Sequence, residues 1–406
     1  FGMLFKFKAQ TPTGEIVEGE AEATDKFSLA AELKKKRYTV LVARELRSGR
    51  SRLKTYIEGI LGVVHLHEKI IFMRSLSAML KAGLSLTRSL SILGRQSKSR
   101  TLQNTIHNVE RSISKGLSFH QATAPYPKVF SPLAQAMIAV GEESGRLPES
   151  LTIVAEHLDK NYELQKKIRG ALIYPAIIIT AMIIIGVIML TYVVPILTST
   201  FAELGVELPL PTKIVIGISS FLVNHTFLVI LLLVFSVSLI VYGARTRAGR
   251  RMLDLLLLKI PLIGELVRQI NSARTARTLA SLLTAGVSIL PALSTTKDVV
   301  QNSYYKGVLA GAEGAIQRGT ALSFIFKQHP NLYPALVSEM TAVGEETGKL
   351  SEMLLNLAVF YEEEVAQKTK DMSIIIEPFL MVIIGVAVGL FAVSMIMPLY
   401  SVLGEV

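Results

Sequence analysis

The sequence predicts a mainly α-helical integral membrane protein that carries a duplicated helical unit. Half of its 406 residues are hydrophobic and only 18% are charged, a composition that excludes a disordered chain and is unusual for a soluble one. Three stretches are long and apolar enough to cross a bilayer as helices. Two sets of motifs recur at one fixed offset, which indicates an internal repeat. Cysteine is absent, which removes disulfides, thiolate metal sites and cysteine nucleophiles.

The N-terminal part differs in pattern from the rest and is predicted to form a small α+β module, residues 3–46. Alternating side chains on either side of Thr13-Gly14 predict a β-hairpin. Residues 27–37 fit a helix, and residues 39–42 fit a further strand. A polar and basic linker, residues 47–64, follows and is typical of a tether between folded parts.

The first predicted membrane span is residues 171–197. No charged residue occurs in the 26 positions from Leu172 to Leu197, and about 20 helical residues are enough to cross the hydrocarbon core. We expect Pro175 to lie in the first turn of this helix, where its missing N–H costs little.

The second apolar stretch, residues 214–242, is interrupted by Asn224-His225. A polar pair is expensive at bilayer depth, so we expect two pieces. A periplasmic loop with an interfacial helix that begins at Pro211-Thr212 occupies residues 198–225, and the second span occupies residues 226–243. One long tilted helix is the alternative.

The third span is predicted at residues 374–400 and contains one charge, Glu377, next to Pro378. In the first turn of a helix the N-terminus favours a carboxylate, so a capping or interface position is the leading interpretation and ion coupling is the alternative. Gly385 and Gly389 form a G-x-x-x-G pattern, which places both on one face where another helix can approach closely. Chance in a glycine-tolerant segment is the alternative there.

The basic residues predict the orientation. Lys and Arg cluster before the first span, after the second and before the third, whereas residues 198–213 hold one Lys and two Glu. Because positive charge concentrates on cytoplasmic flanks, the N-terminus and residues 244–373 are predicted to be cytoplasmic, and the C-terminal tail is predicted to be periplasmic or extracellular. Basic runs beside a membrane contact lipid or an acidic partner more often than nucleic acid.

Two sequence motifs each occur twice, at an offset of 203 residues. Arg74–Gly83 corresponds to Arg277–Gly286, and Val140–Leu147 corresponds to Val343–Leu350. Apolar residues at three- and four-residue intervals predict about six helices in each copy, packed as antiparallel hairpins into a six-helix bundle.

These two cytoplasmic helical repeats are assigned to residues 65–170 and 244–373, and each leads into a span. The span at 226–243 has no counterpart in the repeat, and it returns the chain so that both copies lie on the same side of the membrane. The repeat is therefore parallel, unlike the inverted repeats common in transporters.

Glycine is expected at helix ends within each copy. The sequence Ala-Gly-(Leu/Val)-Ser predicts a helix end with a left-handed glycine, followed by a serine N-cap. The glycine after Glu-Glu-(Ser/Thr) ends the next helix in the same way. These residues are Gly83, Ser85 and Gly145 in the first copy and Gly286, Ser288 and Gly348 in the second.

The two Gly-Glu-Glu-(Ser/Thr)-Gly-(Arg/Lys) segments are the main candidates for chemistry. They lack the spacing of a phosphate loop, and adjacent carboxylates repel phosphate. Neighbouring glutamates on a helix point apart, which makes them poor acid–base pairs. We interpret these carboxylates as helix-end or partner-facing groups: Glu142, Glu143, Glu345 and Glu346. Without a metal-ligand cluster or a catalytic triad in the sequence, no enzyme activity, metal or cofactor is predicted.

A transporter or channel is the alternative function. It requires polar residues along the spans at mid-depth, where only Thr180, Thr191 and a few serines occur. A membrane-tethered enzyme is a second alternative, and the sequence offers no convergent catalytic set for it.

Several segments together carry a family resemblance. They are FKFKAQTPTGEIVEGEAEA near the N-terminus, both R-x-L-x-x-x-L-x-A-G-(L/V)-S-(L/I) segments, both V-G-E-E-(S/T)-G-(R/K)-L segments, the prolines at 175 and 378, and MIMPLYSVL near the C-terminus. In this order the chain resembles the F-type platform proteins of type II secretion and the PilC platform proteins of type IV pilus assembly. Ser85 and Ser288 depart from the pattern, because many relatives carry proline there.

The resemblance implies a platform protein in the bacterial inner membrane. A cytoplasmic assembly ATPase is then expected to dock on the cytoplasmic repeats, and their movement is expected to pass to pilins or pseudopilins at the membrane face. Other inner-membrane assembly components, membrane lipid and a second copy of the chain, as in a dimer, are further expected partners. The partner-interface candidates are Arg74, Glu142, Glu143, Gly145, Arg277, Glu345, Glu346 and Gly348. The membrane-packing candidates are Pro175, Glu377, Pro378, Gly385 and Gly389.

Overall fold

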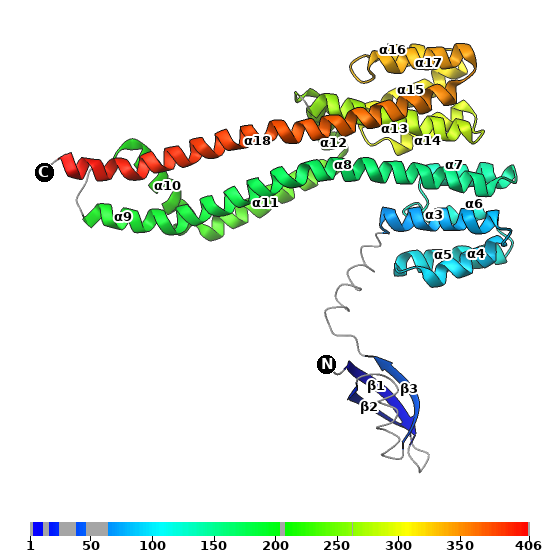
Figure 1. Ribbon diagram of the computed structural model, residues 1–406, viewed down its shortest axis with the longest axis horizontal. Helices are drawn as coiled ribbons and strands as arrows, with labels where there is room; N and C mark the ends of the chain where they lie inside the picture. Colours follow the sequence, from blue (N-terminus) through cyan, green and yellow to red (C-terminus); the bar gives the residue numbers. More distant parts are fainter. Residues whose placement is uncertain are drawn as a thin grey trace.

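The computed structural model describes residues 3–10, 16–23, 38–45, 64–203, 208–261 and 263–404. From residue 64 onward the described chain consists of helices and their connections (Figure 1). Short helices gather at one end of this part, and long apolar helices run from it to the other end, where the C-terminus lies. The prediction of a mainly α-helical protein is confirmed.

The N-terminal part forms a three-stranded antiparallel sheet. Strand β1 (Met3–Gln10) lies between β2 (Ile16–Ala23) and β3 (Thr39–Glu45). The predicted hairpin and further strand correspond to these strands. The predicted helix at 27–37 and residues 47–63 of the predicted linker lie outside the described residues, so the α+β module and its tether stay predictions.

The first copy of the repeat begins with α3, which packs antiparallel on α8. The Ser77 hydroxyl donates to the Pro148 carbonyl at 2.6 Å, and Arg74, earlier on α3, reaches Asp159, later on α8. In the same way α4 packs on α5, and α7 packs on α8. The helices are α3 (Leu66–Lys81), α4 (Leu86–Gln96), α5 (Arg100–Ser114), α6 (Phe119–Thr123), α7 (Pro132–Glu143) and α8 (Leu147–Ile188).

The second copy repeats this order. Helices α14, α15, α16 and α18 begin 203 residues after α4, α5, α6 and α8 respectively, which confirms the predicted internal repeat. The helices are α13 (Ile263–Thr284), α14 (Ile289–Val299), α15 (Ser303–Gln317), α16 (Leu322–Lys327), α17 (Ala335–Thr347) and α18 (Leu350–Gly404).

Three glycine turns in each copy use the left-handed backbone region. The N–H of Gly83 donates to Leu80 and that of Leu84 to Met79, both at 3.0 Å, so the orphan carbonyls at the end of α3 are satisfied. Only glycine adopts this conformation without strain. The pairs related by the repeat are Gly83 and Gly286, Gly116 and Gly319, and Gly145 and Gly348, with φ between +69° and +94°. The predicted left-handed glycines are confirmed.

The two predicted serine N-caps differ. The Ser85 side chain accepts the N–H of Arg88 at 3.4 Å and caps α4, as predicted. Ser288 stands at the N-cap position of α14, but its side chain makes no cap hydrogen bond there.

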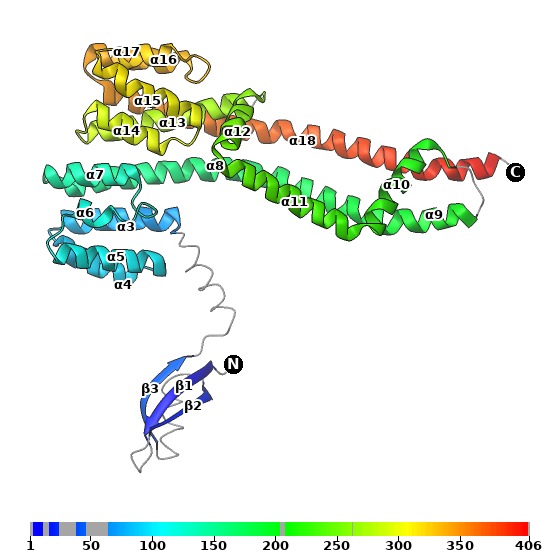
Figure 2. The same cartoon turned by 180° about the vertical axis from the view of Figure 1, so that it is seen from behind.

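Both copies share one hydrophobic core. A single cluster of buried side chains includes Met73, Leu76 and Met137 of the first copy and Leu279 and Leu293 of the second. Helices α7 and α8 contact α13 and α14 of the second copy, and α8 also contacts α18 farther along. Helix α13 therefore lies between α18 and the first copy, an arrangement that both views show (Figure 2).

Three described helices are long and apolar enough to cross a membrane. They lie within Leu147–Glu203, Thr226–Arg245 and Leu350–Ile396, and most side chains of these apolar segments are not buried within the protein. The remaining elements of this region are η1 (Met189–Val193, a π-helical turn), α9 (Val194–Glu203), α10 (Leu210–Asn224), α11 (Thr226–Arg245) and α12 (Arg247–Lys259).

The second apolar stretch is two helices, as predicted, and the alternative of one long helix is wrong. Helices α10 and α11 separate at His225, whose backbone leaves helical geometry with φ −121° and ψ 31°. The Thr212 hydroxyl of α10 donates to the Ser394 carbonyl of α18, and the Ser219 hydroxyl donates to the Leu190 carbonyl of η1. These hydroxyl donors join α10 to α18 and to η1, and the π-helical turn of η1 alters the carbonyl pattern that Ser219 meets.

Two residues expected in first turns lie in helix interiors, so that prediction was wrong. Helix α8 is continuous from Leu147 and α18 from Leu350, which leaves Pro175 and Glu377 many turns from a helix N-terminus. The amphipathic helix of each copy runs without a break into the apolar segment, so the change in hydropathy does not mark a helix start. Neighbouring groups make an internal proline tolerable in a membrane helix, and Glu377 lies too far from the start of α18 for that N-terminus to stabilise its charge.

Candidate functional site

The first glutamate of the first Gly-Glu-Glu segment caps a helix that is distant in sequence. At the end of α7, the Glu142 carboxylate accepts the N–H of Phe119 at 2.6 Å and that of His120 at 2.9 Å. These are the first two residues of α6. The first N–H groups of a helix lack partners within it, so a carboxylate that binds two of them stabilises the helix.

The second copy repeats this cap. Glu345 accepts the N–H of Leu322 at 2.6 Å and that of Ser323 at 3.2 Å at the start of α16, and it also accepts the Ser323 hydroxyl. The neighbouring glutamates, Glu143 and Glu346, are exposed. The four carboxylates therefore divide into two that hold a helix and two that face outward.

The glycine before each pair of glutamates was missed by the sequence reasoning. A Cβ at Gly141 would lie 2.7 Å from Ser150 Cβ and 3.1 Å from Leu147 Cα, and one at Gly344 would lie 2.8 Å from Leu350 Cα. These glycines let α7 approach α8 and α17 approach α18. Their presence in both copies was the signal that could have identified them.

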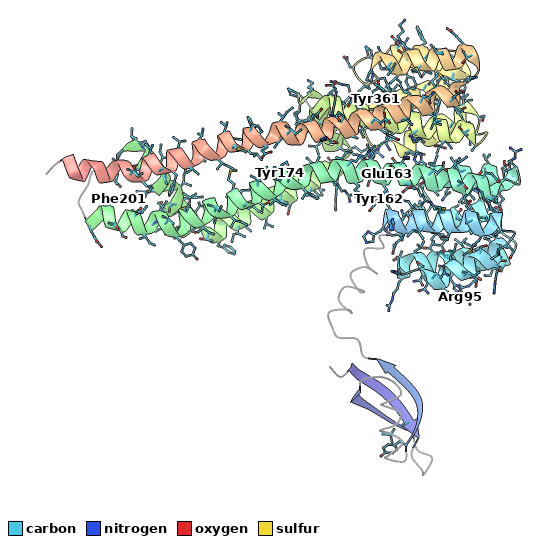
Figure 3. All side chains as sticks on the ribbon, in the orientation of Figure 1. Arg95, Tyr162, Glu163, Tyr174, Phe201 and Tyr361 are labelled. Atoms are coloured by element: carbon cyan, nitrogen blue, oxygen red, sulfur yellow. The ribbon has the colours of Figure 1, made fainter. Side chains whose placement is uncertain are left out.

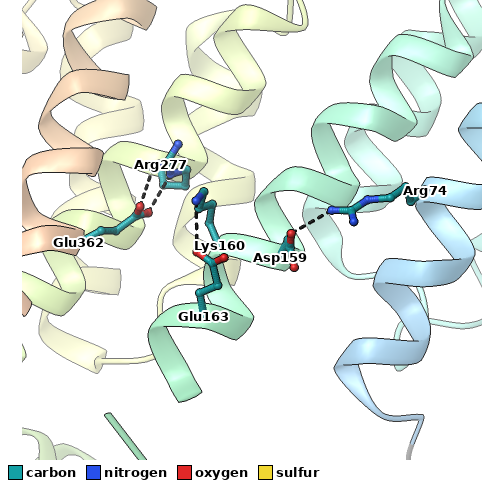
Figure 4. Close-up of polar contacts among 6 residues, drawn as sticks. All are labelled: Arg74, Asp159, Lys160, Glu163, Arg277 and Glu362. Atoms are coloured by element: carbon teal, nitrogen blue, oxygen red, sulfur yellow. Dashed lines mark hydrogen bonds and ion pairs between the residues drawn. The ribbon is translucent and has the colours of Figure 1, made fainter. Parts of the chain in front are cut away.

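Arg74 and Arg277 form ion pairs at equivalent positions. Arg74 Nη2 lies 2.9 Å from Asp159 Oδ2, with 62% of the arginine side chain exposed. Arg277 binds Glu362 through Nε at 2.8 Å and Nη2 at 2.6 Å, and only 12% of its side chain is exposed. Figure 4 shows both pairs, each between the first helix of a copy and the long helix that ends it. Both arginines therefore hold helices together within one copy.

The contact between the copies encloses a histidine. His157, in the part of α8 that belongs to the first copy, is buried, and its Nδ1 has no hydrogen-bond partner. Burial, together with the positive charges of Arg277 and Arg274, lowers the pKa of His157 to about 3. This side chain is therefore neutral at the interface.

The membrane-packing candidates lie in different surroundings. The Tyr174 hydroxyl donates to Glu377 Oε1 at 3.2 Å, so two residues related by the repeat offset of 203 touch one another between α8 and α18. Figure 3 shows where Tyr174 lies along α8. Pro175 is buried and Pro378 is exposed. Gly385 and Gly389 are exposed, and a Cβ at either would meet no other atom within 4 Å.

The glycine turns of each copy gather at the end that points away from the apolar helices. Antiparallel packing of α3 on α8 brings the turn after α3 beside the start of α8, and the Glu142 cap brings the start of α6 to the same place. In both copies this end is the one opposite the apolar helices (Figure 1). We call this surface the distal face and define it by the turns at Gly83, Gly116, Gly145, Gly286, Gly319 and Gly348.

No group of three or more acidic or histidine side chains that could hold a metal ion occurs among the described residues. What the distal face presents is exposed charge, including Glu143 and Glu346, on helix ends that the core holds in place. Such a surface is suited to contact with another protein.

These features define a class of protein: a duplicated α-helical protein whose two copies share a core at one end of a set of membrane-length helices. The chain belongs to the family of the type II secretion system (T2SS) protein F. The sequence model of that family matches residues 72–195 and again residues 275–398, which is the same duplication.

Named relatives cover almost the whole chain. It is 36% identical over 403 residues to the type IV pilus assembly protein PilC of Thermus thermophilus, which covers 99% of this chain and 98% of the relative. It is 30% identical over 407 residues to PilC of Myxococcus xanthus, with 99% and 95% covered. The type II secretion system protein F of Pseudomonas aeruginosa is 27% identical over 401 residues, with 98% of both chains covered.

Proposed function

We propose that the protein is the inner-membrane platform of a bacterial type IV pilus or type II secretion machine. It couples a cytoplasmic assembly ATPase to the polymerisation of pilins or pseudopilins. The full-length similarity to proteins named for pilus assembly and for type II secretion supports this role. It is not an enzyme in this proposal, so the ATPase supplies the energy.

The single observation that carries the proposal is the placement of both copies at one end of the membrane-length helices. Equivalent residues, Tyr174 and Glu377, meet between α8 and α18, so the long helices of the two copies contact each other at equivalent positions. A partner on the distal face can then push or turn both copies at once. The continuous helices α8 and α18 carry that movement directly into the membrane.

The orientation follows from the basic flanks of the spans. The N-terminal module is cytoplasmic, and so are both copies, which form six-helix bundles within residues 65–170 and 244–373. The C-terminal tail is periplasmic or extracellular. The spans are 171–197, 226–243 and 374–400, and α10 belongs to a periplasmic or interfacial segment at 198–225.

The site residues divide by role. Glu143 and Glu346 contact the ATPase on the distal face, whereas Glu142 and Glu345 fix the helix ends beside them. Gly145 and Gly348 shape the turns, and Arg74 and Arg277 hold the long helices to the copies.

The outward-facing membrane positions are where pilins, other assembly components or a second copy of the chain would pack. Pro378, Gly385 and Gly389 belong to this group because they are exposed on α18. Pro175 and Glu377 instead shape the contact of α8 with α18.

A photo-crosslinking experiment in the native host tests the distal face. A photoreactive amino acid at Glu143 or at Glu346 is expected to trap the ATPase, because both side chains are exposed on that face. The matched control is Lys98, an exposed residue at the connection of α4 and α5, the opposite end of the first copy. Equal trapping from Lys98, or none from either glutamate, contradicts the assignment.

The transporter alternative is separated by two measurements. Deletion of the gene is expected to abolish surface filaments or secretion, and the wild-type gene is expected to restore them. Purified protein in sealed vesicles is expected to show no solute flux. Flux without any filament or secretion defect would favour the transporter.

A further inference from the structure

Helix α12 turns sharply away from the end of the second span. One residue, Thr246, separates it from α11, and the Thr246 hydroxyl accepts the N–H of Gly249 at 3.1 Å. A Cβ at Gly249 would overlap the Gly243 carbonyl oxygen of α11, so only glycine allows this corner. Figure 2 shows α12 lying across the direction of α11.

One side of α12 is fixed to the second copy. Asp254 accepts the N–H of Ser303, at the start of α15, at 2.8 Å. Arg250 donates to the Gln301 carbonyl at 3.2 Å. The Arg251 guanidinium lies 5.4 Å from the centre of the Tyr304 ring. These three contacts join α12 to the start of α15 and the residues just before it.

The opposite side of α12 is apolar and uncovered. Met252 is 73% exposed and Leu256 is 52% exposed, and Leu253 lies between them. Spacings of three, four and seven residues place these side chains on the same face as Gly249. Because Gly249 lies against the end of α11, this face points back toward the membrane side of the corner.

We propose that α12 lies in the cytoplasmic surface of the bilayer and binds anionic phospholipid. Met252 and Leu256 enter the boundary between headgroups and acyl chains, while Lys259, which follows Leu256 by three residues and is also exposed, meets the phosphates. Two observations favour lipid over a protein: α12 follows directly from a membrane-length helix, and its exposed surface combines apolar and basic side chains.

Among the described residues this attachment is made by the second copy. The contacts to Gln301, Ser303 and Tyr304 tie the lipid-bound helix to the start of α15 and the residues just before it. The second copy is therefore held to the membrane surface at α12 as well as through α18. The proposal rests on the membrane orientation of the chain and not on its role in pilus assembly.

Fluorescence tests the proposal, because the chain contains no tryptophan. The variants Met252→Trp and Leu256→Trp each give the full-length protein a single reporter. In vesicles of phosphatidylcholine and phosphatidylglycerol we expect blue-shifted emission and at least twofold stronger quenching by lipids brominated near the headgroup than by lipids brominated near the chain ends. Acrylamide in the water is expected to quench weakly.

Two matched variants make every outcome decisive. Leu117→Trp, on an exposed turn of the distal face, is expected to be quenched by acrylamide and not by brominated lipid. Phe235→Trp, exposed in the middle of α11, is expected to be quenched best by deeply brominated lipid. If the reporters on α12 behave like Leu117→Trp, or are shielded from both quenchers as under a protein partner, the proposal is wrong. If Phe235→Trp is not quenched by lipid, the insertion of α11 in the membrane is itself wrong.

Discussion

The two copies of the repeat have the same turns and caps but unequal surroundings. In the first copy, five of the 16 residues of α3 are buried, and one side of the helix faces solvent. In the second, 13 of the 22 residues of α13 are buried, because α18 lies on one side of the helix and the first copy on the other. The buried set of α13 includes polar residues such as Asn271, Ser272 and Thr278.

This difference shows that equivalent contacts in the two copies need not contribute equally to the free energy of unfolding. Residues that set the fold, such as the glycines with positive φ and the capping glutamates, are the same in both copies. Residues whose contribution depends on solvent exposure differ in effect between the copies, because α13 is covered on two sides and α3 is not. Matched substitutions at equivalent positions measure this directly.

The largest difference is expected between the two arginines. Arg277→Ala leaves the largely buried Glu362 without its partner and should lower the free energy of unfolding by about 3 kcal/mol. Arg74→Ala removes an exposed pair and should cost less than about 1 kcal/mol. Urea unfolding in detergent micelles, followed by far-UV circular dichroism, gives both values. Equal losses would mean that the surroundings of the copies do not matter.

A smaller loss is expected where glycine permits close helix approach. Gly141→Ala and Gly344→Ala insert a methyl group against the backbone or Cβ of the next helix, and each should cost about 1–3 kcal/mol in the same unfolding experiment. Here the copies should behave alike, because the contact lies inside each copy. Gly385→Ala is the control, since its Cβ meets no atom within 4 Å, and it should cost nothing.

The interface between the copies should respond to acid through His157. The folded-state pKa is lowered to about 3 from 6.5, so below pH 6.5 the unfolded chain takes up a proton that the folded chain excludes. Stability is therefore complete above pH 6.5 and is lost as the pH falls toward 3, by about 2 kcal/mol between pH 7 and pH 5. The equivalent residue in the second copy is Phe360, so His157→Phe is the matched control.

The test of this prediction compares how steeply the free energy of unfolding changes with pH in the wild type and in the variant. Urea unfolding of the wild type and of His157→Phe at several pH values should give a steeper decrease in stability for the wild type below pH 6.5. If the two proteins lose stability in parallel, His157 is not the group that titrates.

Particular residues show which features of the fold and of the candidate site could be predicted from the sequence. The repeat predicted the glycine turns, because a left-handed backbone needs glycine in both copies and the fixed offset reveals the pair. It did not predict the role of Glu142, because the N–H groups that the carboxylate binds are 22 and 23 residues away and only the packing of α6 beside α7 brings them together. The Gly141 contact was missed for the same reason.

The sequence located the apolar segments correctly, but the prediction that a helix begins at each of them was wrong for the first and third spans. The apolar segments were found, but Pro175 and Glu377 were assigned to helix starts that do not exist. A helix satisfies its backbone hydrogen bonds within itself, so a change of solvent along α8 or α18 leaves no break in the helix. Sequence periodicity alone does not distinguish one long helix from two joined ones.

The capping glutamates should matter equally in both copies and more than their neighbours. Glu142→Gln and Glu345→Gln keep an acceptor but remove the charge at the start of α6 and α16, and each should cost about 1 kcal/mol. Glu143→Gln and Glu346→Gln, at exposed positions, should leave the urea midpoint unchanged. A loss at the exposed pair as large as at the capping pair would contradict this division.

The smallest expected difference concerns the two serines at the starts of α4 and α14. Ser85 accepts the N–H of Arg88, so Ser85→Ala should lower stability by about 1 kcal/mol. Ser288 occupies the same position without a cap hydrogen bond, so Ser288→Ala should change stability by less than about 0.5 kcal/mol. Urea unfolding of both variants beside the wild type measures the pair. The sequence presents these serines as equals, and only side-chain geometry separates them. A loss at Ser288 equal to that at Ser85 would mean that the second cap forms in solution.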